Sequence, residues 1–147
     1  METDVPSTLP LYSGASAPTA SRWDGLRVLL AEDSATARMW LRYVFSSIID
    51  GIQIEEAEDG RTALKVLTAS RVDLVVTDLQ MPGMDGNSLI HVLRRNAVLR
   101  RKPILVVTGA AESFGADLGQ DPFLRVLSKP PRPEQIIQAV EELLPSY

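Results

Sequence analysis

Short apolar runs alternate with amphipathic stretches of helical periodicity from Gly25 onward. Such alternation is typical of βα repeats, whose consecutive strands lie parallel in one sheet. The apolar runs predict five strands, at residues 26–31, 52–57, 72–77, 103–107 and 123–128. The sequence therefore predicts an α/β fold built around a parallel five-stranded sheet.

The amphipathic stretches after these strands predict the helices. Ser34 is a suitable N-cap for the first helix, because its hydroxyl can accept a hydrogen bond from a free backbone N–H, and Gly51 ends that helix. Further helices are expected at residues 62–70, 87–97 and 133–144. The stretch 111–120 contains Gly115 and Gly119, each of which costs a helix interior about 0.8–1 kcal/mol relative to Ala, so we expect a short, mobile helix there.

Residues 1–24 differ in composition from the rest of the chain. They are rich in Ser, Thr, Ala and Pro and show no periodicity, so they bury too little apolar surface to offset the entropy of ordering. We expect a flexible tail at residues 1–24 and one domain at residues 25–147. A chain of 147 residues with 45% hydrophobic content suits a single core of ordinary size.

Charge and cysteine content exclude several classes of protein. The net charge of −4 argues against nucleic acid or an anionic membrane as the main partner. The chain has no cysteine, so it can form neither a disulfide framework nor a thiolate zinc site. The sequence begins without a secretory signal and holds no stretch that could span a bilayer, so we expect a cytoplasmic protein without membrane insertion.

Polar side chains stand at the ends of four expected strands. The pair Glu32-Asp33 follows the first strand, Asp78 the third, Thr108 the fourth and Lys129 the fifth. Open α/β folds place their chemistry at the carboxyl edge of the sheet, where such strand ends meet. We therefore expect an acidic pair, a lone aspartate, a hydroxyl and an ammonium group to converge on one small area.

Four short motifs occupy these strand ends: Glu32-Asp33-Ser34, Asp78-x-x-Met81-Pro82-x-Met84-Asp85-Gly86, Val107-Thr108-Gly109 and Ser128-Lys129-Pro130. Together they resemble the receiver domain of two-component response regulators, over about residues 25–145. The resemblance implies a (βα)5 doubly wound, flavodoxin-like fold with strand order 2-1-3-4-5. It also implies that Asp78 is a phosphorylatable aspartate.

The implied chemistry needs a divalent cation. Asp78 and an incoming phosphoryl group are both negatively charged, so a cation must neutralise their approach. By resemblance this cation is Mg²⁺, held by Asp33, Asp78, the backbone carbonyl of Gln80 and, through water, Glu32; such oxygen ligands suit Mg²⁺. Without the metal, we expect three clustered carboxylates to repel one another and to raise the pKa of at least one of them.

Lys129 and Thr108 complete the implied site. The Lys129 ammonium can pair with Asp78 before the reaction and with a phosphoryl oxygen afterwards. Thr108 would donate its hydroxyl to another phosphoryl oxygen, and its movement is the expected switch. The resemblance also implies a cis peptide bond before Pro130. Receiver domains often carry an inward-swinging aromatic residue at the position of Val126, so the usual coupling of that residue to Thr108 is not expected here.

These features predict a single-domain response regulator or phosphorelay receiver. Asp78 accepts a phosphoryl group from a histidine kinase or a histidine phosphotransfer protein, and phosphorylation switches binding to an unknown downstream protein. The chain is expected to be no enzyme beyond its own phosphotransfer and dephosphorylation, and to be a monomer or weak dimer. By resemblance the helix after Ser34 docks the donor, with Ala35, Arg38, Met39 and Arg42 as candidate contacts.

Three alternatives stay open at this point. A pseudo-receiver would bind partners without phosphorylation, and Val126 is the feature that favours it. A phosphatase of the haloacid dehalogenase type also uses an aspartyl nucleophile and Mg²⁺, but Asp78-Leu79-Gln80 lacks the second acid of the Asp-x-Asp pattern. A flavodoxin-like cofactor binder is disfavoured, because no Ser/Thr/Gly-rich phosphate loop follows the first strand.

Overall fold

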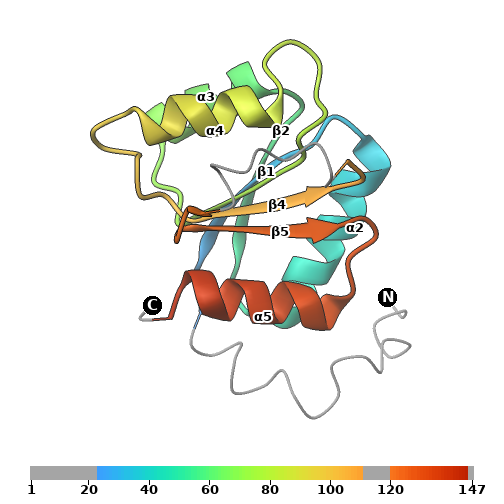
Figure 1. Cartoon of the computed structure of the whole chain (residues 1–147). Coiled ribbons are helices and arrows are strands. Elements are labelled where there is room, and N and C mark those ends of the chain that lie inside the picture. The colour runs from blue at the N-terminus through green and yellow to red at the C-terminus, as the bar shows by residue number, and fades with distance from the viewer. Residues whose placement is uncertain (1–22, 111–119, 146–147) are drawn as a thin grey trace.

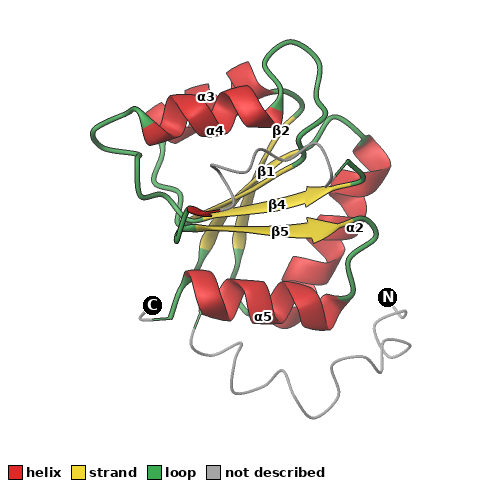
Figure 2. Ribbon diagram, viewed as in Figure 1, coloured by secondary structure: helices red, strands yellow, loops and turns green. Residues whose placement is uncertain are grey.

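The computed structural model describes residues 23–110 and 120–145, which form a parallel five-stranded sheet between two layers of helices (Figure 1, Figure 2). The strands are β1 (Arg27–Ala31), β2 (Gln53–Ala57), β3 (Leu74–Thr77), β4 (Ile104–Thr108) and β5 (Leu124–Ser128). The helices in this part of the chain are α2 (Ala35–Ile48), α3 (Gly60–Ala69), α4 (Gly86–Arg94) and α5 (Pro133–Leu143). The strand order β2-β1-β3-β4-β5 confirms the predicted doubly wound, flavodoxin-like topology.

Successive strand residues face opposite sides of the sheet, and this alternation builds two cores. Val28 and Leu30 of β1 pack on the side of α2 and α5, whereas Leu29 and Ala31 pack on the side of α3 and α4. Figure 1 shows these two helix pairs on opposite faces of the sheet. Because both faces are covered, the central strands β3 and β4 are buried along their whole length, as expected of parallel strands.

The side chain of Asp59 corrects the expected start of α3. It accepts a hydrogen bond from the Thr62 N–H at 2.8 Å, so the helix begins at Gly60 and not at Thr62. The end of α4 is corrected in a similar way. The Asn96 side chain accepts hydrogen bonds from two backbone N–H groups beyond the helix, and this turn ends α4 at Arg94, short of the expected residue 97.

Trp23 corrects the expected domain boundary. Its side chain is fully buried in the core beneath α2 and α5, next to Leu26. An indole of this size buries a large apolar area, so the packed domain includes Trp23 and the expected tail, residues 1–24, is two residues too long at its end. Residues 1–22 lie outside the described residues, as does the expected helix at 111–120 except for Gln120.

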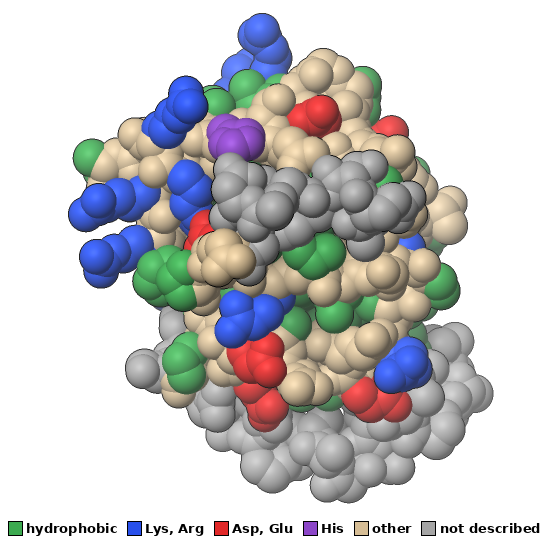
Figure 3. All heavy atoms as spheres, in the orientation of Figure 1, with side chains coloured by type: hydrophobic (Ala, Val, Ile, Leu, Met, Phe, Trp, Pro, Cys, Tyr) green, Lys and Arg blue, Asp and Glu red, His purple; other side chains and the backbone are tan. Residues whose placement is uncertain are grey.

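Two basic side chains stabilise the end of the sheet where the strands begin. The guanidinium of Arg94 pairs with Asp121 and donates hydrogen bonds to the carbonyl oxygens of Lys102, at 2.9 Å, and Phe123, at 3.2 Å. The Lys102 ammonium donates a hydrogen bond to the carbonyl oxygen of Val72, and burial lowers its pKa. Arg100 and Arg101, both exposed, line the same hollow as Arg94 and Asp121. Figure 3 shows several Lys and Arg side chains gathered on the left of the molecule. Positive charge therefore collects at the end of the sheet opposite the strand ends that carry the acids.

Candidate functional site

The carboxyl ends of the strands bring four polar side chains together. Glu32 follows β1, Asp78 follows β3, Thr108 ends β4 and Lys129 follows β5. Backbone hydrogen bonds extend the sheet to these positions: the Asp78 N–H donates to Ala31 O at 3.2 Å, and the Lys129 N–H to Thr108 O at 2.9 Å. Glu32, Asp78 and Thr108 are buried, at 2%, 5% and 0% exposure. The strand ends therefore form a compact polar site.

Lys129 reaches across the site and bridges two acids. Its Nζ lies 2.6 Å from Oε1 of Glu32 and 2.6 Å from Oδ2 of Asp78. Both carboxylates are almost completely enclosed, whereas the lysine side chain is 28% exposed. These charge-assisted hydrogen bonds tie β5 to β1 and β3. The sequence predicted the contact with Asp78 but not the contact with Glu32.

The bridge holds Asp78 in its ionised form. Burial raises the pKa of this carboxyl group, but hydrogen bonds from the Lys129 and Thr108 side chains and from the Gln80 N–H outweigh burial, so the pKa lies below its ordinary value. For Lys129, burial acts to lower the pKa, but the hydrogen bonds to both acids outweigh burial, so the pKa lies above its ordinary value. At neutral pH the site therefore presents a carboxylate, which is the nucleophilic form, beside an ammonium group.

Glu32 has a raised pKa, as expected for one of the acids, but the main cause differs from the expected one. Burial is the largest influence, and the negative charge of Asp78 contributes least. The Glu32 carboxylate accepts hydrogen bonds from Lys129 and, at 3.0 Å, from the backbone N–H of Ser34.

Asp33 lies apart from the bridged pair. Its side chain is exposed, and within residues 23–110 and 120–145 no three Asp, Glu, His or Cys side chains are grouped to hold a metal ion. In this structure the three acids are therefore not gathered at one point, and the role of Asp33 as a metal ligand stays a prediction. The physical reason is that the Lys129 ammonium lies between Glu32 and Asp78, while Asp33 faces solvent.

Both oxygens of Asp78 have a hydrogen-bond donor. Oδ2 accepts from Lys129, and Oδ1 accepts from the backbone N–H of Gln80 at 3.1 Å. The Thr108 hydroxyl accepts a hydrogen bond from the Ala110 N–H at 3.1 Å, so its oxygen is anchored to the loop that follows β4. These contacts fix the direction in which the carboxylate points. The roles expected for the Gln80 carbonyl and for movement of Thr108 stay predictions.

Two further residues of the β5 end are placed by the structure. Val126 lies beside Val106 in the sheet register and packs, half-buried, against the core under α3 and α4. The peptide bond between Lys129 and Pro130 is cis. The position at which other receiver domains often carry the inward-swinging aromatic residue is thus occupied by Val126, a small side chain that packs against the core.

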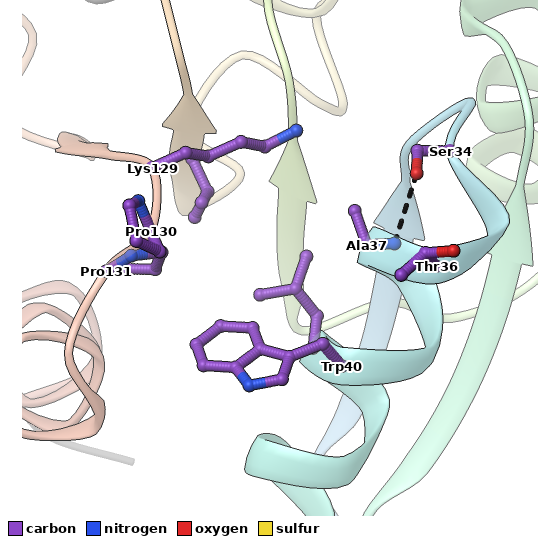
Figure 4. A pocket seen from close by; sticks show the side chains of 9 residues that line it. Ser34, Thr36, Ala37, Trp40, Lys129, Pro130 and Pro131 are labelled. Atoms are coloured by element: carbon purple, nitrogen blue, oxygen red, sulfur yellow. Dashed lines mark hydrogen bonds between the residues drawn. The ribbon is translucent and has the colours of Figure 1, made fainter.

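An apolar pocket of about 330 Å³ opens beside Lys129. Figure 4 shows that it lies between α2 and the loop after β5, with the Trp40 indole on one side and Pro130 and Pro131 on the other. Trp40 is 39% exposed although it is a large apolar residue. A partner that approaches Asp78 over α2 would therefore meet an apolar surface next to the polar site.

Of the residues expected to contact a donor on α2, Ala35, Met39 and Arg42 are exposed and Arg38 is not. The Arg38 side chain is 14% exposed and turns toward Glu56 of β2. Sequence reasoning missed this arrangement, and a signal for it was present. Arg38 lies three residues before Leu41 and seven before Phe45, both buried, so the helical period places it on the inward face.

Comparison with known proteins agrees with this fold. The family model of the response regulator receiver domain matches residues 28–141. The chain is 36% identical over 112 residues to a gliding motility regulatory protein from Myxococcus xanthus, a match that covers 74% of this chain and 14% of that protein. It is 33% identical over 87 residues to the chemotaxis protein CheY of Pseudomonas aeruginosa, covering 59% of this chain and 69% of that protein.

A solved structure supports the same assignment. The signal receiver domain of a signal transduction histidine kinase from Syntrophus aciditrophicus superposes with a TM-score of 0.68 at 28% identity, covering 81% of this chain and 89% of that one. No helix in the described part of the chain has the length and apolar character needed to cross a membrane. With the family model matching most of its length, the chain belongs to the response regulator receiver domains of two-component systems.

Proposed function

We propose that Asp78 accepts a phosphoryl group from the phosphohistidine of a histidine kinase or a histidine phosphotransfer protein. The observation that carries this proposal is the placement of the buried Asp78 carboxylate, whose oxygens accept hydrogen bonds from the Gln80 N–H at 3.1 Å and from the Lys129 ammonium at 2.6 Å. Receiver domains are generally phosphoacceptors that interact with kinases and downstream effectors. In this proposal the chain catalyses only its own phosphorylation and dephosphorylation.

The transfer step uses one oxygen of Asp78 as nucleophile. This oxygen forms a bond to phosphorus while the bond between phosphorus and the donor imidazole nitrogen breaks, and the electron pair of that bond stays on the imidazole. Lys129 leaves its contact with Asp78 and pairs with a phosphoryl oxygen, which keeps its positive charge next to the developing negative charge. Thr108 donates its hydroxyl to a second phosphoryl oxygen. The product is an acyl phosphate on Asp78.

The residues present fit a magnesium ion. Two buried carboxylates share one ammonium group, and Asp33 stands next in sequence, so the site carries excess negative charge and offers the oxygen ligands that Mg²⁺ prefers. Asp33, Asp78 and the Gln80 carbonyl would hold the ion, and Glu32 would act through water. When bound, the ion supplies positive charge that reduces the repulsion between Asp78 and the phosphoryl group. Lys129 must loosen its contact with Asp78 for this ligand set to form.

The face of α2 beside the site is the proposed docking surface for the donor. Met39 and Trp40 are exposed, at 66% and 39%, and Trp40 lines the pocket next to Lys129. Aromatic side chains at the edge of such a pocket are common anchors in protein interfaces. A donor helix that covers these residues would bring its phosphohistidine near Asp78.

Output from the site is proposed to pass through Thr108. Its hydroxyl oxygen accepts a hydrogen bond from Ala110, so a movement of Thr108 toward the phosphoryl group would displace the start of the following loop. Val126 is too small to repeat the aromatic swing of other receivers. The matched relatives are in part much longer proteins, so action as a stand-alone response regulator, a monomer or weak dimer and a cytoplasmic location all stay predictions.

The test is the intact mass of the protein after incubation with Mg²⁺ and acetyl phosphate. We expect one phosphoryl adduct that requires Mg²⁺, is removed by hydroxylamine as an acyl phosphate should be, and is absent from Asp78→Asn. Asp50→Asn, which changes an exposed acid away from the site, should keep the adduct. If the wild type gave no adduct with acetyl phosphate or with a panel of histidine kinases, the pseudo-receiver would replace this proposal.

A further inference from the structure

Arg38 of α2 touches the backbone of the acidic loop. Its Nη1 donates a hydrogen bond to the carbonyl oxygen of Glu32 at 2.7 Å and a longer one to that of Asp33 at 3.4 Å. The guanidinium therefore contacts two consecutive peptide groups, the two that flank the α-carbon of Asp33. The orientation of these two peptide groups sets the direction in which the Cα–Cβ bond of Asp33 leaves the backbone.

Glu56 of β2 holds Arg38 from the other side. The Nε of Arg38 lies 2.9 Å from Oε1 of Glu56, while Oε2 of Glu56 accepts a hydrogen bond from Arg42 at 2.6 Å. The strand period explains the placement, because Ile54 packs against the core under α2 and Glu56 lies two residues further along the same face. Hydrogen bonds from Arg42, and to a smaller extent from Arg38, lower the pKa of Glu56, although burial acts in the opposite direction. Glu56 is therefore ionised at neutral pH.

We propose that Arg38 is a positioning residue that orients the Glu32–Asp33 loop for binding of a divalent cation, with Glu56 as its anchor. The inference rests on the proposed function, in which Asp33 is a metal ligand. Three contacts on one guanidinium link α2, β2 and the loop after β1. Arginine suits this role because its planar fork can donate in several fixed directions at once, which the point charge of a lysine cannot do.

The chain offers a matched control in Arg42. This arginine binds the same carboxylate of Glu56, but its second contact is the carbonyl oxygen of Ile54 at 3.4 Å, within β2 and not in the acidic loop. Arg42→Met therefore removes a cation and an ion pair with Glu56 and leaves the loop contacts intact. Arg38→Met removes the same kind of group together with both loop contacts.

The first measurement is the Mg²⁺ affinity of the full chain by calorimetry. We expect Arg38→Met to weaken it about tenfold, the lower end of the effect typical for groups that orient metal ligands, and Arg42→Met to change it less than twofold. With acetyl phosphate, the Mg²⁺ concentration for half-maximal phosphorylation should rise in Arg38→Met, while the rate at saturating Mg²⁺ stays within about twofold of wild type. Glu56→Gln should lie between the two arginine variants.

The second measurement is hydrogen exchange of the Ser34 amide, whose N–H donates to Glu32 at 3.0 Å. Exchange should be faster in Arg38→Met than in wild type and unchanged in Arg42→Met. This readout needs neither metal nor phosphoryl group, so it separates failure of the inference from failure of the proposed function. Equal Mg²⁺ affinity in Arg38→Met and wild type would overturn the inference. An equal loss of Mg²⁺ affinity in Arg38→Met and Arg42→Met would also overturn it. Urea unfolding of each variant excludes a general loss of the fold.

Discussion

The α-carbon of Gly86, the first residue of α4, lies directly against the backbone carbonyl group of Asp78. A β-carbon at position 86 would overlap the Asp78 carbonyl oxygen and would come within 2.8 Å of the α-carbon of Leu79. The Gly86 N–H also donates to the Leu79 carbonyl at 3.1 Å, so backbone atoms leave no space there. The start of α4 thus holds the proposed phosphoacceptor in place through close backbone contact.

Gly86→Ala should therefore damage both stability and phosphorylation. Forcing one extra carbon against rigid backbone costs about 1–3 kcal/mol, and relief requires Asp78 to move. We expect a lower urea midpoint and at least tenfold slower phosphorylation by acetyl phosphate. Gly83→Ala is the control: its φ of 70° makes a β-carbon cost about 1–2 kcal/mol, but no atom lies within 4 Å of that carbon, so phosphorylation should change little. Equal phosphorylation rates in the two variants would contradict this prediction.

Lys129→Met should destabilise the domain in a manner that depends on pH. It leaves two buried carboxylates without their shared cation, and we expect a loss of about 2–3 kcal/mol at pH 7, less than for a fully buried pair because Lys129 is 28% exposed. The pKa of Asp78 is lowered in the fold, so its contribution is present above its ordinary value of 3.8 and is lost as pH falls below that value. The pKa of Lys129 is raised, so its contribution is lost as pH rises above 10.5.

The difference in unfolding free energy between wild type and Lys129→Met should consequently be largest between pH 3.8 and pH 10.5 and should shrink below and above this range. Urea titrations across the pH range measure it. Arg95→Met, an exposed cation at the other end of the sheet, serves as the control and should show no such profile. A constant difference at all pH values would mean that lost packing, and not charge, explains the effect.

Glu32→Gln should stabilise the protein in the absence of metal. Burial raises the pKa of Glu32 above its ordinary value of 4.5, so this group favours the folded state below pH 4.5, and that contribution is lost as pH rises through the raised pKa. Removing the charge at pH 7 should add about 1 kcal/mol, a typical gain at a functional site. Urea unfolding in EDTA tests this, with exposed Glu58→Gln as control; a lower midpoint for Glu32→Gln at pH 7 would count against it.

Trp40→Ala should slow phosphotransfer from a protein donor and not from a small one. The pocket beside Lys129 loses its aromatic wall, so a docked donor helix loses contact area, whereas acetyl phosphate does not use that surface. We expect at least threefold slower transfer from a phosphorylated histidine phosphotransfer protein and less than twofold change with acetyl phosphate. Val98→Ala, which alters an 88% exposed residue outside that surface, should affect neither rate. Equal slowing with both donors would place Trp40 in the reaction and not in docking.

Each expected strand lies within two residues of the observed one. The central strands β3 and β4 were predictable because buried parallel strands are short, continuous apolar runs, whereas the edge strand β2 is largely exposed and carries two glutamates. Helix ends were less certain, because the side chains of Asp59 and Asn96 each bind backbone N–H groups, and such local bonds compete with the backbone hydrogen bonds of a helix. At the site, strand ends identified Glu32, Asp78, Thr108 and Lys129.

The sequence did not predict that Lys129 contacts Glu32 as well as Asp78, or that the Arg38 side chain turns inward. Lys129 and Glu32 lie 97 positions apart, and their contact depends on which way a long side chain leans across the sheet edge. For Arg38, residue type suggested a surface cation, although the helical period placed it inward. Its position in the helical period predicted its burial better than its residue type did, because a guanidinium can be buried when carbonyl and carboxylate oxygens surround it.

The bridge made by Lys129 has a consequence for how this domain comes to be folded. Buried carboxylates that lack a cationic partner oppose folding unless they take up a proton. In this domain Lys129, which directly follows the last strand β5, is the cationic partner of both acids. The two acids can therefore be buried in the folded domain without an ion from outside the chain.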